Sequence, residues 1–347
     1  MSGTSADGVD AALLRTDGES HIEFLGGLTL PYDEPMRLRL LEASQHDVPL
    51  SELLQLERDV TIWHADAVEQ LRAQHPKHAE KAELMGFHGH TLRHIPDSGL
   101  TLQIGNPWLL SQRTGYEVVS DFRRRDIAWG GQGAPLAAMF HRAVFADDPP
   151  PLVVLNIGGV SNVTWLGEGG SVIAGDTGPG CGLIDEWTQE MAGLPHDTDG
   201  KLAQAGKVDE SVVASALSAP FFSRPLPKAA DRYDFDHVDV STLSVEDGAA
   251  TLCAVTTRAI AEAVEKLPQK PLTLWVTGGG AKHPVIMRML GESFDSISTV
   301  DERGLSSETL EAECFAWLAI RRRLNLPITV PETTGCSEPM SGGAIAN

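Results

Sequence analysis

One carboxylate, Asp176, stands where it could act as a general base. It lies in VIAGDTGPGCGLIDEW, after an apolar stretch that predicts a strand and before a Gly-Pro-Gly turn, with a helix expected to begin near Cys181. A carboxylate at the end of a strand beside a helix N-terminus is well placed to accept a proton in a cleft. An aspartate there can equally cap the helix, so the local sequence leaves both roles open. Asp185, inside the expected helix, is either a supporting residue or a solvent-exposed one.

Three glycine-rich turns have the residue types that bind phosphate. The chain opens on MSGTSADGVDAALL, and LVVLNIGGVSNV and LTLWVTGGGAKHP also bring a strand to a turn of small residues. Backbone N–H groups and hydroxyls in such turns can surround an anion. Neither Gly-Lys pair is followed by Ser or Thr, as a Walker A loop requires, and the kinase HRD and DFG sequences are absent. Each turn alone is more often an ordinary one, but the three in this order favour a polyphosphate site.

A short basic stretch, VVSDFRRRDIAWGGQGAPL, stands out in an acidic protein. Its three arginines are flanked by Asp121 and Asp126 and followed by glycines. The pattern is typical either of an anion-recognising patch or of a solvated charge cluster, and the glycines favour the patch. In GFHGHTLRH we expect loop histidines that hydrogen-bond a polar ligand, and we do not expect a metal site, at His88, His90 and His94.

The elements that must position these residues alternate between helix and strand, which indicates an α/β fold. Helical periodicity runs from about Glu34 to Lys81, a strand is expected in AELMGFHGHT, and Pro284 lies near the start of a helix. The strand and turn pattern of the N-terminus returns at LVVLNIGG, which suggests two related halves. The proline-rich ADDPPPL is the expected linker between them.

Composition excludes several classes of protein. The formal net charge of −21 over 347 residues argues against binding nucleic acid or an anionic membrane surface. No apolar stretch approaches the length of a membrane span, and the N-terminus is unlike a signal peptide. Four widely spaced cysteines indicate neither disulfides nor zinc. We therefore expect a reduced, cytoplasmic protein.

Taken together, the motifs closely resemble those of the anhydro-N-acetylmuramic acid kinase family. They are GTSADGVD, HGHTLRH, QIGNP, DFRRRDIAWGGQGAPL, LNIGGVSNV, DTGPG, VTGGGAKHP and TGCSEP, in order along nearly the whole chain. The resemblance implies an α/β fold of two actin-like (ribonuclease H-like) domains of duplicated topology with a nucleotide cleft between them. The first domain would be residues 1–148 joined by a C-terminal segment of about 320–347, and the second residues 149–319.

The resemblance also implies a reaction and a set of site residues. Family members open the 1,6-anhydro ring of 1,6-anhydro-N-acetylmuramic acid with water and phosphorylate O6, using ATP and Mg²⁺, in cell-wall recycling. Asp176 matches the catalytic aspartate. The expected nucleotide-binding residues are Gly3, Thr4, Ser5, Ala6, Asp7, Gly8, Val9, Asp10, Asn156, Gly158, Gly159, Gly278, Gly279 and Gly280. The expected sugar-binding residues are His88, Arg124, Arg125, Asp126, Gly178 and Glu311. No protein ligand to the metal is assigned, and a homodimer is expected.

Three places depart from the family pattern. His90 stands where the family usually has Gln, Cys181 where it usually has Asn, and PKAADRYDF where a Ser-Thr-Gly-Arg pattern is expected. The strand that normally leads into the first hairpin is reduced to Met1 and Ser2. Either the natural start lies further upstream, which we favour, or the protein manages with half a strand. Two alternatives stay open: a kinase for an ordinary N-acetylhexosamine, and a nucleotide-gated binding module.

Overall fold

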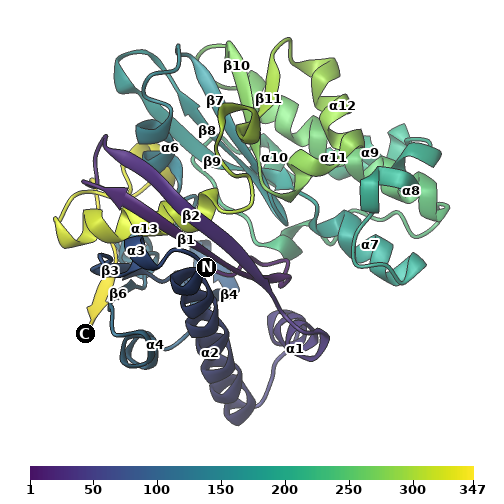
Figure 1. Cartoon of the computed structure of the whole chain (residues 1–347). Helices are drawn as coiled ribbons and strands as arrows, with labels where there is room; N and C mark the ends of the chain where they lie inside the picture. Colours follow the sequence, from purple (N-terminus) through teal and green to yellow (C-terminus); the bar gives the residue numbers. More distant parts are fainter. The chain divides into compact units, whose positions relative to one another are not determined.

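The computed structural model describes residues 1–347, apart from the side chain of Tyr233 (Figure 1). The chain forms two units: unit 1 is Met1–Asp147 with Glu308–Asn347, and unit 2 is Asp148–Ser307. The sequence placed the return to the first unit near residue 320, but the structure places it at Glu308. The reason is that the whole of helix α13 (Leu310–Arg323) packs against strands of unit 1.

Unit 2 is built on one five-stranded sheet, in the order β11-β10-β7-β8-β9. Strand β7 lies in the middle, parallel to β10 and antiparallel to β8, so its apolar run is buried on both faces. The strands are β7 (Leu152–Ile157), β8 (Val160–Leu166), β9 (Val172–Pro179), β10 (Thr273–Thr277) and β11 (Ile297–Thr299).

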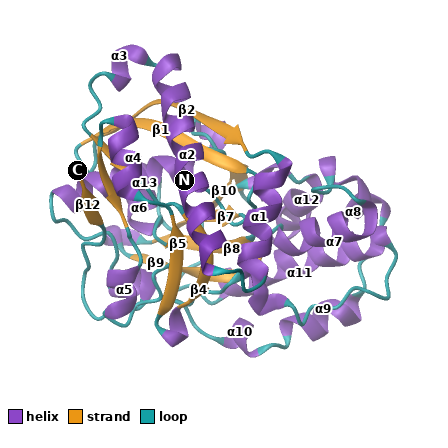
Figure 2. Cartoon of the chain, turned by 90° about the horizontal axis from the view of Figure 1, so that it is seen from below, coloured by secondary structure: helices purple, strands orange, loops and turns teal.

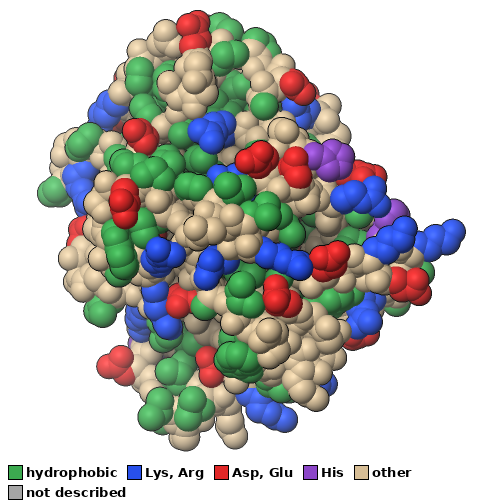
Figure 3. Space-filling view, turned by 90° about the vertical axis from the view of Figure 1, so that its left-hand side faces the viewer, with side chains coloured by type: hydrophobic (Ala, Val, Ile, Leu, Met, Phe, Trp, Pro, Cys, Tyr) green, Lys and Arg blue, Asp and Glu red, His purple; other side chains and the backbone are tan. Residues whose placement is uncertain are grey.

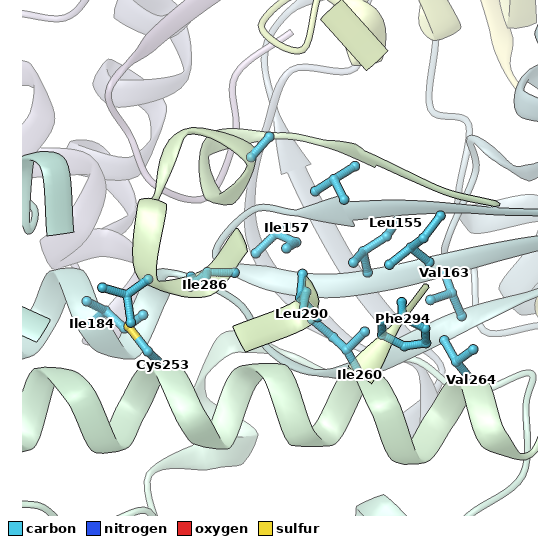
Figure 4. Packing of buried hydrophobic residues seen from close by; sticks show 14 of the residues in the cluster. Leu155, Ile157, Val163, Ile184, Cys253, Ile260, Val264, Ile286, Leu290 and Phe294 are labelled. Atoms are coloured by element: carbon cyan, nitrogen blue, oxygen red, sulfur yellow. The ribbon is translucent and has the colours of Figure 1, made fainter. Parts of the chain in front are cut away.

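A long helix, α11 (Val245–Glu265), covers one face of this sheet. Figure 4 shows Ile260 and Val264 of this helix on its side toward the sheet, with Val163 of β8 close to Val264, while Cys253 lies beside Ile184. The remaining helices of unit 2 are α7 (Gly182–Ala192), α8 (Lys201–Ala205), α9 (Glu210–Leu217), α10 (Pro220–Ser223) and α12 (Pro284–Ser293). Pro284 is the first residue of α12, as expected from its fixed φ.

Unit 1 holds three smaller sheets (Figure 2). They are the hairpin of β1 (Gly8–Thr16) and β2 (Ile22–Pro31), the hairpin of β4 (His90–Ile95) and β5 (Leu100–Ile104), and a sheet in the order β12-β6-β3, formed by β3 (Leu84–Gly86), β6 (Glu117–Ser120) and β12 (Ala344–Ala346). Its helices are α1 (Glu34–Gln45), α2 (Leu50–Gln74), α3 (Pro76–Ala79), α4 (Pro107–Thr114), α5 (Arg124–Ala128), α6 (Ala138–Val144), α13 and α14 (Pro331–Thr334). Short 3₁₀ segments are Pro96–Ser98 in unit 1 and Glu168–Gly170, Thr198–Gly200, Arg232–Phe235, Gly279–Lys282 and Val300–Arg303 in unit 2.

The expected α/β class is therefore confirmed, and so is the helical stretch between Glu34 and Lys81. Pro49 divides that stretch into two longer helices, because proline lacks the N–H that continues a helix. Among the described residues, no helix is long and apolar enough to cross a membrane.

Candidate functional site

Asp176 lies within strand β9, which continues to Pro179. It pairs with Asn162 of β8, and the next pair is Ser161 with Gly178, so Thr177 is an extra residue in a β-bulge. A bulge bends a strand and redirects the side chains beside it. The first residue before α7 is Cys181, and that helix has no side-chain cap. The helix-capping role left open by the sequence is therefore excluded for Asp176.

A separate segment of unit 2 holds the Asp176 carboxylate. The N–H of Ala230 donates to Asp176 Oδ2 at 2.8 Å, and the N–H of Asp176 donates to the carbonyl of Lys228 at 2.7 Å. The side chain of Asp176 is only 6% exposed, so little water reaches it. Its Oδ2 atom has a fixed hydrogen-bond donor in this buried position. This is the PKAADRYDF stretch that departs from the family pattern, and here it positions the carboxylate through its backbone.

Lys228 places a positive charge near the same carboxylate. Its ammonium donates to the carbonyl of Phe221 at 2.8 Å and lies 4.2 Å from the centre of that ring. Burial lowers the pKa of Lys228 to about 8, and Asp176 acts in the opposite direction. A neighbouring cation favours the ionised form of a carboxylate, which is the form that a general base requires.

The turn after β7 and the turn after Asp176 are joined by three backbone hydrogen bonds. The N–H groups of Gly180, Cys181 and Gly182 donate to carbonyls of Gly158 and Gly159 at 2.9, 2.7 and 3.2 Å. A Cβ at Gly180 would stand 2.1 Å from the carbonyl oxygen of Gly158, so only glycine permits this approach. The second glycine turn is thereby fixed to the segment that carries Asp176.

The third glycine turn lies beside the end of β7. Gly278 has φ +81°, and a Cβ there would stand 2.4 Å from Asn156 Oδ1. A Cβ at Gly279 would meet no atom within 4 Å, and one at Gly158 would meet only the carbonyl of Val160, at 3.6 Å. Open space over adjacent backbone turns fits a polyphosphate, whose oxygens need close approach to N–H groups.

In unit 1 the first glycine turn is tightly folded. The N–H of Ala6 donates to the carbonyl of Gly3 at 3.1 Å, and the hydroxyl of Ser5 donates to Asp7 at 3.0 Å. The side chains of Ala6 and Val9 are buried in the core, so only their backbone groups remain candidates for ligand contact. Asp10 accepts a hydrogen bond from Thr29, and burial raises the pKa of its carboxyl. A Cβ at Gly8 would stand 2.6 Å from the carbonyl of Leu30, which makes that glycine a packing requirement.

A second cluster of unit 1 joins His88 to Arg123. The Nε and Nη2 groups of Arg123 lie 3.1 and 2.9 Å from His88 Nε2, and its Nη1 donates to the carbonyl of Gly133 at 2.7 Å. Burial and the arginine charge hold the pKa of His88 well below its usual range, so the ring is neutral and its Nδ1–H faces the carbonyl of Gly89 at 3.2 Å. Glu311, exposed in the first turn of α13, is close enough to Arg123 to feel its charge.

The whole chain, residues 1–347, matches the family model described as anhydro-N-acetylmuramic acid kinase. The chain belongs to the anhydro-N-acetylmuramic acid kinase family. Two relatives carry that name: one from Paramagnetospirillum magneticum is 43% identical over 99% of this chain and 97% of its own length, and one from Rhodopseudomonas palustris is 44% identical over 100% and 98%. Among solved structures, the activator of 2-hydroxyisocaproyl-CoA dehydratase from Clostridium difficile with bound ADPNP is 12% identical, covers 91% of this chain and 96% of its own, and has a TM-score of 0.45.

The residues of the basic stretch that we expect to contact sugar, Arg124, Arg125 and Asp126, differ in their surroundings. Arg124 is largely exposed, with Asp121 3.6 Å away. Arg125 donates to the carbonyl of Ser341 at 2.9 Å and lies over the ring of Trp129. Asp126 is 1% exposed and both its oxygens are occupied. Its partners are the N–H of Gly133 at 2.7 Å, Thr329 at 2.6 Å and Thr334 at 2.7 Å.

Asp126 is therefore held by three hydrogen bonds within the protein, and its contact with the sugar stays a prediction. A Cβ at Gly178 would stand 2.9 Å from Ala259 and Phe222, so packing requires a glycine here, and a contact of its backbone with the sugar stays a prediction. Arg123, in contrast, was absent from the expected sugar contacts of the family motif. Its partner His88 lies 35 residues earlier in the chain, so the contact between the two side chains could not be predicted from the basic stretch alone.

The histidines of the family motif are buried and separately bonded. His90 Nδ1 lies 2.9 Å from the hydroxyl of Ser2, and His94 Nδ1 lies 3.0 Å from that of Thr101. Within the described residues, no three His, Cys, Asp or Glu side chains are placed to hold a metal ion. Burial raises the pKa of the Cys181 thiol, so this residue is an unreactive packing group at the start of α7.

Proposed function

We propose that this chain is an ATP-dependent kinase that opens 1,6-anhydro-N-acetylmuramic acid with water and phosphorylates O6. The products are N-acetylmuramic acid 6-phosphate and ADP, and the role is in peptidoglycan recycling. Membership of the anhydro-N-acetylmuramic acid kinase family over the whole chain supports the substrate. The observation that carries the chemistry is the Asp176 carboxylate, held at 2.8 Å by the N–H of Ala230.

Asp176 is the general base in this proposal. It takes a proton from the water that attacks C1, the C1–O6 bond breaks, and O6 forms a bond to the γ-phosphorus as ADP leaves. The phosphoryl group thus takes the place of the proton that a general acid would give to O6. A positive charge on the neighbouring Lys228 favours the form that this role requires.

In the proposal, the phosphate-binding turns are Gly3–Asp10 and Gly158–Gly159, and Gly278–Gly280 contacts the adenosine. The open space beside Gly3, Gly158 and Gly279 supports the assignment. Mg²⁺ would arrive with ATP and offset the charge of its phosphates. In unit 1, Arg124 or Arg125 would pair with the lactyl carboxylate of the sugar, with Arg123, His88 and Glu311 beside them.

The decisive experiment is mass spectrometry of the sugar product formed from Mg-ATP and 1,6-anhydro-N-acetylmuramic acid in heavy-oxygen water. We expect a 6-phosphate with the heavy label at C1, because water opens the ring. Phosphorylation of an open-ring N-acetylhexosamine without label, and no reaction with the anhydro sugar, would instead assign the chain to the ordinary hexosamine kinases. ATP turnover that no sugar stimulates would point to the nucleotide-gated module.

The proposal includes a homodimer in the cytoplasm, on the resemblance to the family. Light scattering at micromolar concentration should then give twice the chain mass of 37.2 kDa. A mass of one chain would remove the dimer from the proposal and leave the reaction untouched.

A further inference from the structure

The hydrogen bond to the Asp176 carboxylate comes from a segment that runs along the edge of the sheet in unit 2. Strand β9 stands at one end of the strand order. Beside it, the N–H of Asp176 donates to the carbonyl of Lys228 at 2.7 Å, and the N–H of Ala230 donates to Asp176 Oδ2 at 2.8 Å. A Cβ at Gly175 would stand 3.0 Å from the backbone nitrogen of Lys228, so the segment lies directly against the strand. The position of residues 228–230 therefore decides how the Asp176 carboxylate is held.

Beyond Ala230 this segment continues into the 3₁₀ helix Arg232–Phe235. The side chain of Ala230 is 7% exposed and that of Phe235 is 1% exposed, and both belong to one apolar cluster. Apolar packing fixes the depth of the segment, but it is not directional. A contact with a defined direction is needed to aim a single N–H group at one oxygen.

Arg232 supplies such a contact, because it forms an ion pair with Glu186 of helix α7. The Nε group of Arg232 donates to Glu186 Oε1 at 2.7 Å, and its Nη2 group contacts the same oxygen. The two side chains are 10% and 35% exposed, whereas those of the pair Arg258–Glu210 in the same unit are 45% and 67% exposed. Solvent therefore screens the Glu186–Arg232 pair less, and its charge-assisted hydrogen bond restricts the backbone on either side of Arg232.

Helix α7 is itself tied to the strand that carries Asp176. The helix begins at Gly182, about one turn before Glu186. The N–H groups of Gly180–Gly182 are fixed by the carbonyls of Gly158 and Gly159. The contacts thus form a closed path from Asp176 along β9 to α7, across the ion pair to the 3₁₀ helix, and back through the N–H of Ala230 to the carboxylate.

We propose that the Glu186–Arg232 ion pair is a positioning pair that aims the N–H of Ala230 at the Asp176 carboxylate. Without the pair, the 3₁₀ helix loses its connection to α7, and the N–H group leaves Oδ2 for part of the time. The carboxylate then loses a donor that favours its ionised form and adopts other rotamers. Both residues act through Asp176, so this inference rests on the proposed function, in which Asp176 is the general base.

The test replaces the two partners separately, because the two substitutions change the charge in opposite directions. Arg232→Met removes a cation, and Glu186→Ala removes an anion. If the pair acted only through its charges, the first would raise the pKa of the Asp176 carboxyl and the second would lower it. If the pair positions the N–H of Ala230, both raise that pKa, because each loses a hydrogen bond to the ionised form. The other charged side chains of this region are the same in both variants: Asp185, Arg224, Lys228, Asp231, Glu262 and Lys266.

We expect both variants to move the acidic limb of the kcat profile upward by about one pH unit. On the plateau, kcat should fall by about tenfold, because the base is misplaced, while KM for ATP stays unchanged. Hydrogen exchange at the Ala230 amide should become about tenfold faster in both variants. The matched control is Arg258→Met, which removes the exposed ion pair of the same unit and should change none of these quantities.

A combination with Asp176→Asn gives an independent check. Adding Arg232→Met to Asp176→Asn should leave the residual rate unchanged, because no base is left to position. A further loss of rate in the double variant would show that Arg232 acts elsewhere and would overturn the proposal.

Two other results would also overturn it. One is a pair of acidic limbs that move in opposite directions, which leaves only an effect of charge. The other is an Ala230 exchange rate that neither substitution changes. The exchange measurement uses no ATP or sugar, so the positioning role can fail while the unchanged protein still forms the labelled 6-phosphate. Failure of the proposed function would instead appear in the unchanged protein, as absence of that product.

Discussion

At the scale of single residues, a small number of contacts holds each candidate catalytic or binding side chain in place. Asp176 has a backbone donor from Ala230 and a neighbouring cation from Lys228. His88 is kept neutral by burial and by Arg123. The partners that fix these side chains lie far from them in sequence. Conservative substitutions that keep the hydrogen bonds should therefore change the kinetic constants without lowering Tm.

We predict that Asp176→Asn lowers kcat by about 10²-fold or more, because loss of a general base typically costs about 10²–10⁴ in rate. The amide keeps an oxygen for the N–H of Ala230, so Tm and its rise on adding ATP should stay unchanged. Steady-state kinetics and thermal shift measure the two effects. Asp236→Asn, at an exposed position of the same unit, is the matched control, and near-normal turnover of Asp176→Asn would refute the assignment.

Arg124→Ala should raise KM for the sugar by about tenfold, since a hydrogen bond to a charged group contributes about 1.5–3 kcal/mol. KM for ATP should change little, because the proposed partner is the lactyl carboxylate. Arg58→Ala, which removes another well-exposed arginine of unit 1, should leave both constants unchanged. Equal increases in the two KM values for Arg124→Ala would contradict a sugar contact.

At the scale of elements, the glycine turns owe their shape to close backbone approach. Gly278 has the left-handed φ of +81° and no room for a Cβ beside Asn156, whereas Gly279 faces open space. The two neighbouring glycines therefore serve different purposes, one for the shape of the turn and one for access to it.

Gly278→Ala should lower Tm of the protein without ligand by a few degrees, because a left-handed φ with a Cβ costs about 1–2 kcal/mol. Gly279→Ala should leave that Tm unchanged and raise KM for ATP, since its methyl group would enter the space proposed for the nucleotide. Thermal denaturation and kinetics with varied ATP distinguish the pair. If Gly279→Ala binds ATP normally, the turn does not contact the nucleotide.

At the scale of the whole molecule, charge and buried histidines govern the response to pH. On the face seen in Figure 3, Lys and Arg side chains lie among Asp and Glu side chains, although the net charge is −21. Several histidines are buried in unit 1 without charge. Burial lowers the pKa of His90 to about 4 and of His94 to about 3.

A histidine whose pKa is lower in the folded state than in the unfolded state does not affect the free energy of unfolding while it is neutral in both states. As pH falls below about 6.5, the unfolded form binds a proton that the folded form binds only near pH 4, so stability falls across this window. For His90 the loss is on the order of 3 kcal/mol. We predict that His90→Gln flattens the dependence of Tm on pH between 6.5 and 4. His46→Gln, at an exposed position, should not, and an unchanged slope in His90→Gln would show that His90 does not titrate in this way.

The local sequence was sufficient for features that depend on neighbouring residues. Alternating helix and strand patterns predicted the α/β class, and Pro284 and the stretch from Glu34 to Lys81 marked helices, because backbone preferences act over a few residues. The motifs were likewise enough to indicate the family. The sequence placed Asp176 after its strand, whereas the structure places it within β9, because β9 pairs with β8 beyond the apolar run.

Tertiary structure decided which of the candidate side chains are available for chemistry. The hydroxyls of Thr329 and Thr334 donate to the Asp126 carboxylate, and Arg123 lies within hydrogen-bond distance of His88. Both contacts form because packing brings distant segments of the chain together. Ala230, which donates to the Asp176 carboxylate, follows it by 54 residues. Such contacts depend on burial and strand register, which no short stretch of sequence specifies by itself.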